Sequence, residues 1–248
     1  YIIFSIVLVS LFFYQRIFVS SFEGNLLNYL KEVACLFVVI ASFFTLIFIV
    51  TKNHLTQNNS FAALFFCLFM GVFPQILDYT STLIANLFIL LSLRRIVSLK
   101  NKINIKKKIL DATLWICLAT LFDSFSFFFF VPLAISLALY SVFEIKNILI
   151  PFFGVFAFAA LWTSFSLVAH DQLPNINEYL PSLSFEVHDF IFHKNTVFSL
   201  FTATLLIIGI MNYFFSGFFQ NRFNRSSIVL LIFIIAAGFT AFLCSPTE

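Results

Sequence analysis

Long apolar runs separated by short polar breaks make up most of the chain. A helix needs about 20 apolar residues to cross the hydrocarbon core of a bilayer. The pattern therefore predicts an all-α fold, a polytopic transmembrane helix bundle with about nine spans. The expected spans are residues 1–19, 33–51, 61–77, 80–97, 109–122, 125–142, 147–169, 196–216 and 227–244.

Two of the breaks are short, and each is interpreted as the turn of a hairpin. One is the stretch 73–78, which contains Pro74 and Asp78, and the other is Phe122-Asp123-Ser124. The alternative at each place is a single tilted span with an embedded aspartate. Lipid penalises a charged aspartate at the centre of a helix by about 2.5–3.5 kcal/mol, so hairpins are favoured.

The composition supports lipid as the main solvent of the chain. Of 248 residues, 61% are hydrophobic and 10% are charged, and the mean hydropathy is +1.04. A soluble domain has about 25% charged residues. These values exclude a cytosolic enzyme, a disordered chain and a secreted disulfide scaffold.

Cysteine usage and net charge add little. The four cysteines lie inside apolar runs without C-x-x-C spacing and are interpreted as small buried hydrophobes (Cys35, Cys67, Cys117 and Cys244). We therefore expect no metal site and no cofactor. The net charge of +3 is too small to indicate nucleic acid as a partner.

The charged residues predict how the chain is oriented. If the basic loop 98–108 is cytoplasmic, most lysines and arginines fall on that side and most acids on the other, as the positive-inside rule requires. The long loop 170–195 is then periplasmic, in a bacterial inner membrane. The residues expected to anchor the chain at anionic lipid are Arg94, Arg95, Lys106, Lys107 and Lys108. Nucleic-acid binding by this cluster is the remote alternative.

We expect residues 1–248 to form one transmembrane domain of a longer protein. Tyr1 already lies inside an apolar run, and Glu248 follows shortly after another. No soluble domain and no internal repeat is visible.

Few polar groups lie at membrane depth. Asn86 and Asn212 are expected to bond between helices rather than to bind a substrate. Asp111 is expected in the first turn of the fifth span, where an acid complements the helix dipole and the preceding lysines. No charged or broken-helix midplane site is present, which ranks a small-solute transporter low.

The outer face holds the candidate chemistry. Acids near the outer ends of spans are Glu23, Glu32, Asp78 and Asp123, and the loop above them carries His170, Asp171, His188, Asp189 and His193. A carboxylate here could act as a general base, or hold a divalent cation for a phosphate-bearing lipid substrate. The histidine spacing fits no metal template, and a solvated loop needs polar residues in any case.

Two stretches resemble an uncharacterised family of polytopic inner-membrane proteins from Bacteroidota. They are residues 86–99 (NLFILLSLRRIVSL) and 108–122 (KILDATLWICLATLF), with agreement also at 149–153 and 245–248. The resemblance covers nearly the whole chain. It implies a compartment and a source but no activity.

A second resemblance concerns topology. Polytopic C-type glycosyltransferases share an outer loop after the first helix, short hairpins through the seventh, and a long outer loop before the eighth. The tract 78–95, an acid leading into an apolar helix that ends in paired arginines, is also similar. The resemblance implies Glu23 or Asp78 as the catalytic base. The first outer loop here, 20–32, is short and lacks the acidic pair of those enzymes.

Our first hypothesis is a multi-pass inner-membrane protein that acts as a non-catalytic accessory or structural subunit of a cell-envelope complex. The implied partners are the bilayer and other membrane-protein subunits. The first alternative is a reduced C-type-glycosyltransferase-like enzyme that uses a polyprenyl-phosphate-linked sugar at the outer face. The second is a small-solute transporter.

Overall fold

The computed structural model describes residues 1–16, 26–53, 55, 60–72, 74–140, 144–171, 173–174, 204, 207, 211 and 234–235. The described part of the chain is helical and contains no strand. Its α-helices are α1 (Ile2–Tyr14), α2 (Leu26–Lys52), α3 (Phe61–Val72), α4 (Thr80–Ser98), α5 (Ile105–Phe122), α6 (Phe130–Leu139) and α7 (Ile145–His170). Short 3₁₀ helices join or extend them: η2 (Pro74–Asp78), η3 (Leu99–Asn101) and η4 (Ser124–Phe129).

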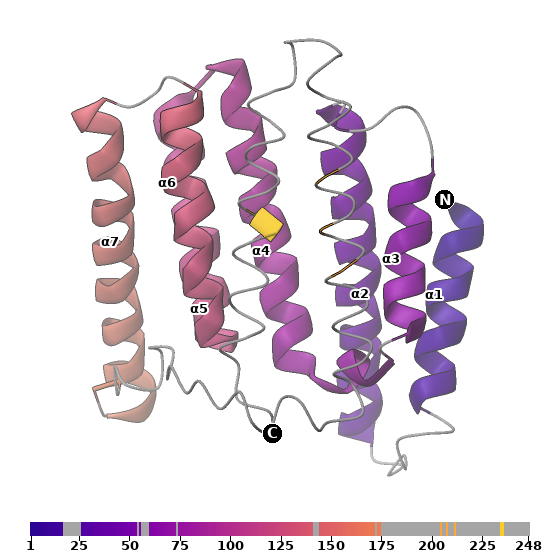
Figure 1. The fold of residues 1–248 in the computed structure, drawn as a ribbon. Helices are drawn as coiled ribbons and strands as arrows, with labels where there is room; N and C mark the ends of the chain where they lie inside the picture. Colours follow the sequence, from indigo (N-terminus) through magenta and orange to yellow (C-terminus); the bar gives the residue numbers. More distant parts are fainter. Residues whose placement is uncertain are drawn as a thin grey trace.

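The α-helices stand side by side, and each runs opposite to the one before it (Figure 1). This alternation gathers the helix ends at two faces. We call one the basic end, where the described charged residues are Lys52, Arg94, Arg95, Lys100, Lys102, Lys106, Lys107, Lys108, Asp111, Glu144 and Lys146. We call the other the acidic end, where they are Arg16, Lys31, Glu32, Asp78, Asp123 and Asp171.

Three helices are long and apolar enough to cross a membrane. They cover Asn28–Lys52, Thr80–Asn101 and Ile145–Ala169. The shorter apolar helices are Ile2–Tyr14, Phe61–Gly71 and Ser124–Leu139. At about 1.5 Å per residue, a helix of 13 residues covers only about 20 Å of a core about 30 Å thick. The first seven expected spans each coincide with a helix, and the last two lie almost entirely outside the described residues.

Local chemistry explains where the helices end. Span 61–77 divides into α3 and η2 because Pro74 has no N–H to donate to the preceding turn of a helix. α5 ends at Phe122, and the chain turns through the extended backbone of Asp123 into η4. Both breaks therefore separate two helices, as the hairpin interpretation expects.

Two clusters of buried side chains hold the bundle together. The first joins α1, α2, α3, η2 and α4 through residues such as Leu8, Phe43 and Leu77. The second joins α4, α5 and α6, and its members include Ile96 and Ile116. α4 and α5 pack most extensively. Their buried surfaces include small side chains that allow close approach, namely Ala85, Ser92, Ala112 and Ala119.

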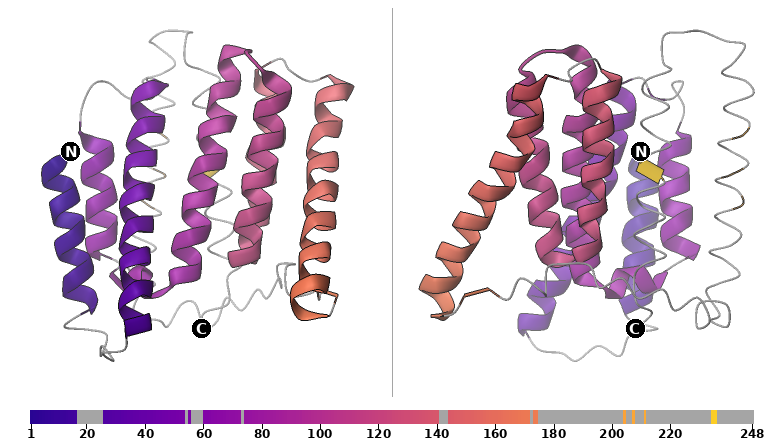
Figure 2. Two further views of the ribbon diagram at one scale, coloured as in Figure 1. Left: turned by 180° about the vertical axis from the view of Figure 1, so that it is seen from behind. Right: turned by 60° about the vertical axis from the view of Figure 1, so that its left-hand side comes forward.

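α7 is the least buried of the membrane-length helices, with 6% of its apolar window inside the described structure. It packs mainly on α5. Gly154 makes this contact, because a Cβ at that position would lie 2.9 Å from Cγ2 of Thr113 in α5. Toward the acidic end α7 diverges from the other helices (Figure 2, right).

Candidate functional site

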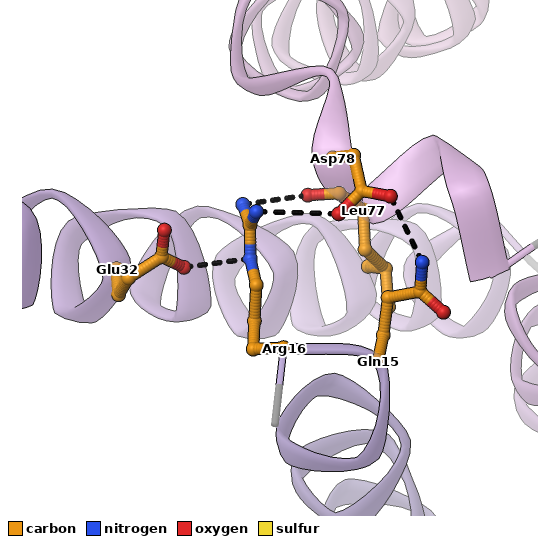
Figure 3. Close-up of polar contacts among 5 residues, drawn as sticks. All are labelled: Gln15, Arg16, Glu32, Leu77 and Asp78. Atoms are coloured by element: carbon orange, nitrogen blue, oxygen red, sulfur yellow. Dashed lines mark hydrogen bonds and ion pairs between the residues drawn. The ribbon is translucent and has the colours of Figure 1, made fainter. Parts of the chain in front are cut away.

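An arginine lies between two carboxylates at the acidic end (Figure 3). The Arg16 side chain contacts Glu32 Oε2 through Nε at 2.7 Å and Asp78 Oδ1 through Nη1 at 3.2 Å. Its Nη2 also donates a hydrogen bond to the carbonyl oxygen of Leu77 at 3.0 Å. Gln15 donates from Nε2 to the second oxygen of Asp78, Oδ2, at 2.8 Å. We call these four side chains, Gln15, Arg16, Glu32 and Asp78, the Arg16 cluster.

Three separate elements supply the Arg16 cluster. Gln15 and Arg16 directly follow α1, Glu32 lies near the start of α2, and Asp78 is the last residue of η2. The planar guanidinium presents its N–H groups in a fixed fork, which suits contacts in several directions at once. The cluster therefore ties the acidic ends of α1, α2 and η2 to one cation.

The cluster is partly buried, and its two carboxylates are more exposed to solvent than its arginine. Side-chain exposure is 14% for Arg16, 24% for Glu32 and 34% for Asp78, and Gln15 is 1% exposed as a residue. Arg16 also lies over the ring of Phe12, with Cζ 5.7 Å from the ring centroid. Partly buried charge pairs of this kind are costly to break, because removing one partner leaves the other without compensation.

Of the two expected catalytic residues, Glu23 and Asp78, the structure describes only Asp78. Glu23 lies outside the described residues, and Asp78 has both carboxylate oxygens engaged, one by Arg16 and one by Gln15. Each oxygen keeps a further acceptor site. To accept a proton from a substrate, however, the Asp78 carboxylate would have to weaken its existing contacts with Arg16 and Gln15. The structure favours a bracing role for this aspartate.

Asp123 and Asp171, the other described acids of this end, do not join the cluster. Asp123 accepts a hydrogen bond from the backbone N–H of Phe125 at 3.1 Å and so caps η4. Its partial burial raises the pKa of the carboxyl, while the bond from Phe125 opposes that rise. Asp171 is exposed at the end of α7, with a left-handed backbone (φ 53°).

The expected outer-loop binding site falls largely outside the described residues. His188, Asp189 and His193 are not described, and of His170 only the backbone is described. Within the described part of the chain, no group of three or more His, Cys, Asp or Glu side chains is placed to hold a metal ion.

At the basic end, three of the five expected lipid anchors make contacts within the protein. The Arg94 guanidinium lies over the ring of Phe48 in α2, with Cζ 4.4 Å from its centroid. Arg95 pairs with Asp111 at 3.1 Å between Nη2 and Oδ2. Lys108 donates from Nζ to the carbonyl oxygen of Ser98 at 2.5 Å. Lys106 and Lys107 are exposed.

The expectation for Asp111 is wrong in one respect. α5 begins at Ile105, about one turn before the expected start, so Asp111 lies in the second turn and no acid occupies the first. Lysine is a good helix former, and Lys106 to Lys108 accordingly belong to the helix. The partner of Asp111 is Arg95 of α4 rather than the lysines before it.

The bond between helices that is expected for Asn86 stays a prediction. No hydrogen bond joins Asn86 to another helix within the described residues, and Asn86 lines an apolar groove of about 560 Å³. The groove lies among α2, α3, η2 and α4, and Thr82 also lines it. Asn212 lies outside the described residues.

Sequence reasoning missed the Arg16 cluster as a unit. From the sequence, Glu32 and Asp78 are named only as separate acids, and Arg16 is a basic residue on the side where most acids lie. This exception to the separation of charges was the signal that could have indicated the cluster, because a cation on the acidic side can pair with the acids there.

No family model, curated protein or solved structure gives a significant match to the chain.

Proposed function

We propose that this chain is a multi-pass protein of a bacterial inner membrane and acts as a non-catalytic accessory or structural subunit of a cell-envelope complex. In this proposal the chain makes about nine spans. The basic end, with loop 98–108, faces the cytoplasm, and loop 170–195 faces the periplasm. The separation of charges between the two ends supports this orientation.

The observation that carries the proposal is the placement of α7. This helix is long enough to span a membrane, yet the described part of the chain buries little of it. Beyond the Gly154 contact it diverges from the bundle, and apolar side chains such as Leu161, Phe165 and Val168 remain 69%, 56% and 88% exposed. A helix that packs on the bundle only near one end leaves exposed apolar surface at its other end, where a partner helix can pack.

The Arg16 cluster supports a structural role at the opposite side of the bundle. Two acids of the acidic end, Glu32 and Asp78, are bound to the same arginine. The two carboxylates join helices through their ion pairs with Arg16. Fixed contacts between helices suit a structural subunit, which catalyses no reaction and therefore requires no carboxylate that is available as a general base.

Co-purification tests the proposal. The full chain, extracted from its native membrane in a mild detergent, is expected to elute with defined membrane-protein partners in fixed ratio. Recovery as a lone monomer that turns over a lipid-linked substrate would reject the proposal.

A second candidate is a C-type-glycosyltransferase-like enzyme that transfers sugar from a polyprenyl phosphate. One observation favours it: seven helices of alternating direction precede loop 170–195, which is the order that such enzymes share. Glu23 and Asp78 would supply the base. In cells, the double variant Glu23→Gln/Asp78→Asn would then lose glycan transfer. Glu32→Gln is the matched control, since it weakens the Arg16 cluster but keeps both of these acids. Normal glycans in the double variant would end this candidate.

A further inference from the structure

A cavity of about 710 Å³ opens at the basic end, where α5 and α7 begin. The polar side chains that line it are Lys102, Asn104, Lys106, Lys107, Glu144 and Asn147. They come from the turn after η3, the first turn of α5 and the start of α7. The cavity is distant from the Arg16 cluster, which lies at the other end of the helices.

The cavity carries an excess of positive charge. Three ammonium groups and one carboxylate line it. Among the described residues, Lys102, Lys106 and Lys107 form no ion pair, whereas nearby Arg95 is paired with Asp111. The lining lysines are therefore available for an anion from outside the chain.

Backbone groups add to this preference. The first N–H groups of a helix have no partner within the helix, and they carry partial positive charge. Neither Asn104 before α5 nor Glu144 before α7 caps its helix with a side-chain hydrogen bond. Two helix N-termini thus border a cavity that already holds three lysines, and phosphate oxygens are well suited to such a combination.

The surroundings of the cavity indicate that the anion carries hydrocarbon chains. Next to it, Ile103, Ile145 and Leu149 are 65%, 78% and 45% exposed. From Ile145 the exposed apolar side chains continue along α7, including Phe152 and Phe156. A lipid whose headgroup lies in the cavity would have its acyl chains along this helix.

We propose that this cavity is a binding site for the phosphate headgroup of an anionic phospholipid. The lysines neutralise the phosphate, N–H groups at the starts of α5 and α7 donate to its oxygens, and the acyl chains follow α7. This is a defined site of one lipid per chain, distinct from a general attraction between a basic loop and a charged membrane surface. The proposal does not depend on the subunit role proposed above.

Native mass spectrometry of the purified full chain in a neutral detergent tests the site, with phosphatidylglycerol and phosphatidylcholine as probes. Wild type is expected to retain one phosphatidylglycerol in preference to phosphatidylcholine. The variant K106Q/K107Q is expected to lower phosphatidylglycerol affinity about tenfold or more, since each lysine near such a surface contributes measurably. The control K100Q/K146Q removes the same charge from the same end of the molecule without touching the cavity lining, and it should retain the lipid.

A gain-of-affinity variant guards against loss through misfolding. Glu144→Gln removes the one carboxylate among the described side chains that line the cavity and should raise phosphatidylglycerol affinity several-fold. Equal losses in K106Q/K107Q and K100Q/K146Q would show diffuse attraction and overturn the proposal. Binding of inorganic phosphate without preference for phosphatidylglycerol would assign the cavity to a free anion and overturn the lipid assignment.

Discussion

Arg16 and Asp78 lie 62 residues apart in the sequence and form an ion pair of 3.2 Å at the acidic end of the bundle. Because Glu32 binds the same guanidinium, the pair is part of a junction among α1, α2 and η2. In lipid, where apolar burial contributes little to helix association, such polar junctions and close packing determine how helices are arranged.

Replacing the cation should loosen this junction. Arg16→Gln would leave two partly buried carboxylates without a positive partner, and we expect a loss of about 1–3 kcal/mol in the free energy of unfolding. Arg16→Lys should be intermediate, because an ammonium group keeps the charge but lacks the planar fork. Lys31→Gln is the control, an exposed cation at the same end. Denaturation in detergent measures the differences; equal effects of Arg16→Gln and Lys31→Gln would contradict the bracing role.

Gly154 should tolerate no side chain where α7 meets α5. In Gly154→Ala the added Cβ would stand 2.9 Å from Thr113 Cγ2 and 3.3 Å from Leu110 Cδ1, so the helices must separate. We expect a destabilisation of about 1–3 kcal/mol. Gly71→Ala is the matched control, because its Cβ would meet Leu11 at an ordinary 3.7 Å. That variant should be neutral or gain up to about 1 kcal/mol from helix propensity.

A compensating change separates this clash from other causes. Thr113→Ser removes the methyl group that Gly154→Ala would strike, and it keeps the hydroxyl that bonds to the carbonyl of Ile109. The double variant should recover most of the lost stability. If it is no more stable than Gly154→Ala alone, the contact is not the source of the effect.

The pair Arg95–Asp111 should couple α4 to α5 only weakly. The Arg95 side chain is 39% exposed and that of Asp111 22% exposed, so solvent screens their attraction. A double-mutant cycle with Arg95→Gln and Asp111→Asn should give a coupling of about 0.2–1 kcal/mol that shrinks as salt is raised. A coupling independent of salt would show a more enclosed pair than the structure contains.

Asp123 should make stability depend on pH in a definite direction. Burial raises the pKa of its carboxyl above the ordinary 3.8, so the folded protein holds this proton more tightly than the unfolded chain does. The contribution is fully present below pH 3.8 and is lost as pH rises through the raised folded value. Asp123→Asn should abolish this dependence while its side-chain oxygen still caps η4. Asp123→Ala should lose the cap, at about 1 kcal/mol. An identical pH profile for wild type and Asp123→Asn would refute the assignment.

The sequence predicted the positions of helices better than their ends and contacts. The break at Asp123 was foreseen, because a carboxylate in a long apolar run is costly in lipid. The start of α5 was placed at residue 109 because lysines were assigned to the loop, although they are good helix formers. The Arg16–Asp78 pair was not foreseen, since nothing in the local pattern connects residues 62 positions apart.

Cross-linking from α7 tests the proposed subunit role most directly. A photo-reactive amino acid at Leu161 (69% exposed, in the second half of α7) would be compared in native membranes with one at Ile3 (75% exposed on α1). We expect a discrete protein adduct from Leu161 and only lipid adducts from Ile3. Lipid adducts alone from Leu161, or the same protein adducts from both positions, would contradict the subunit role.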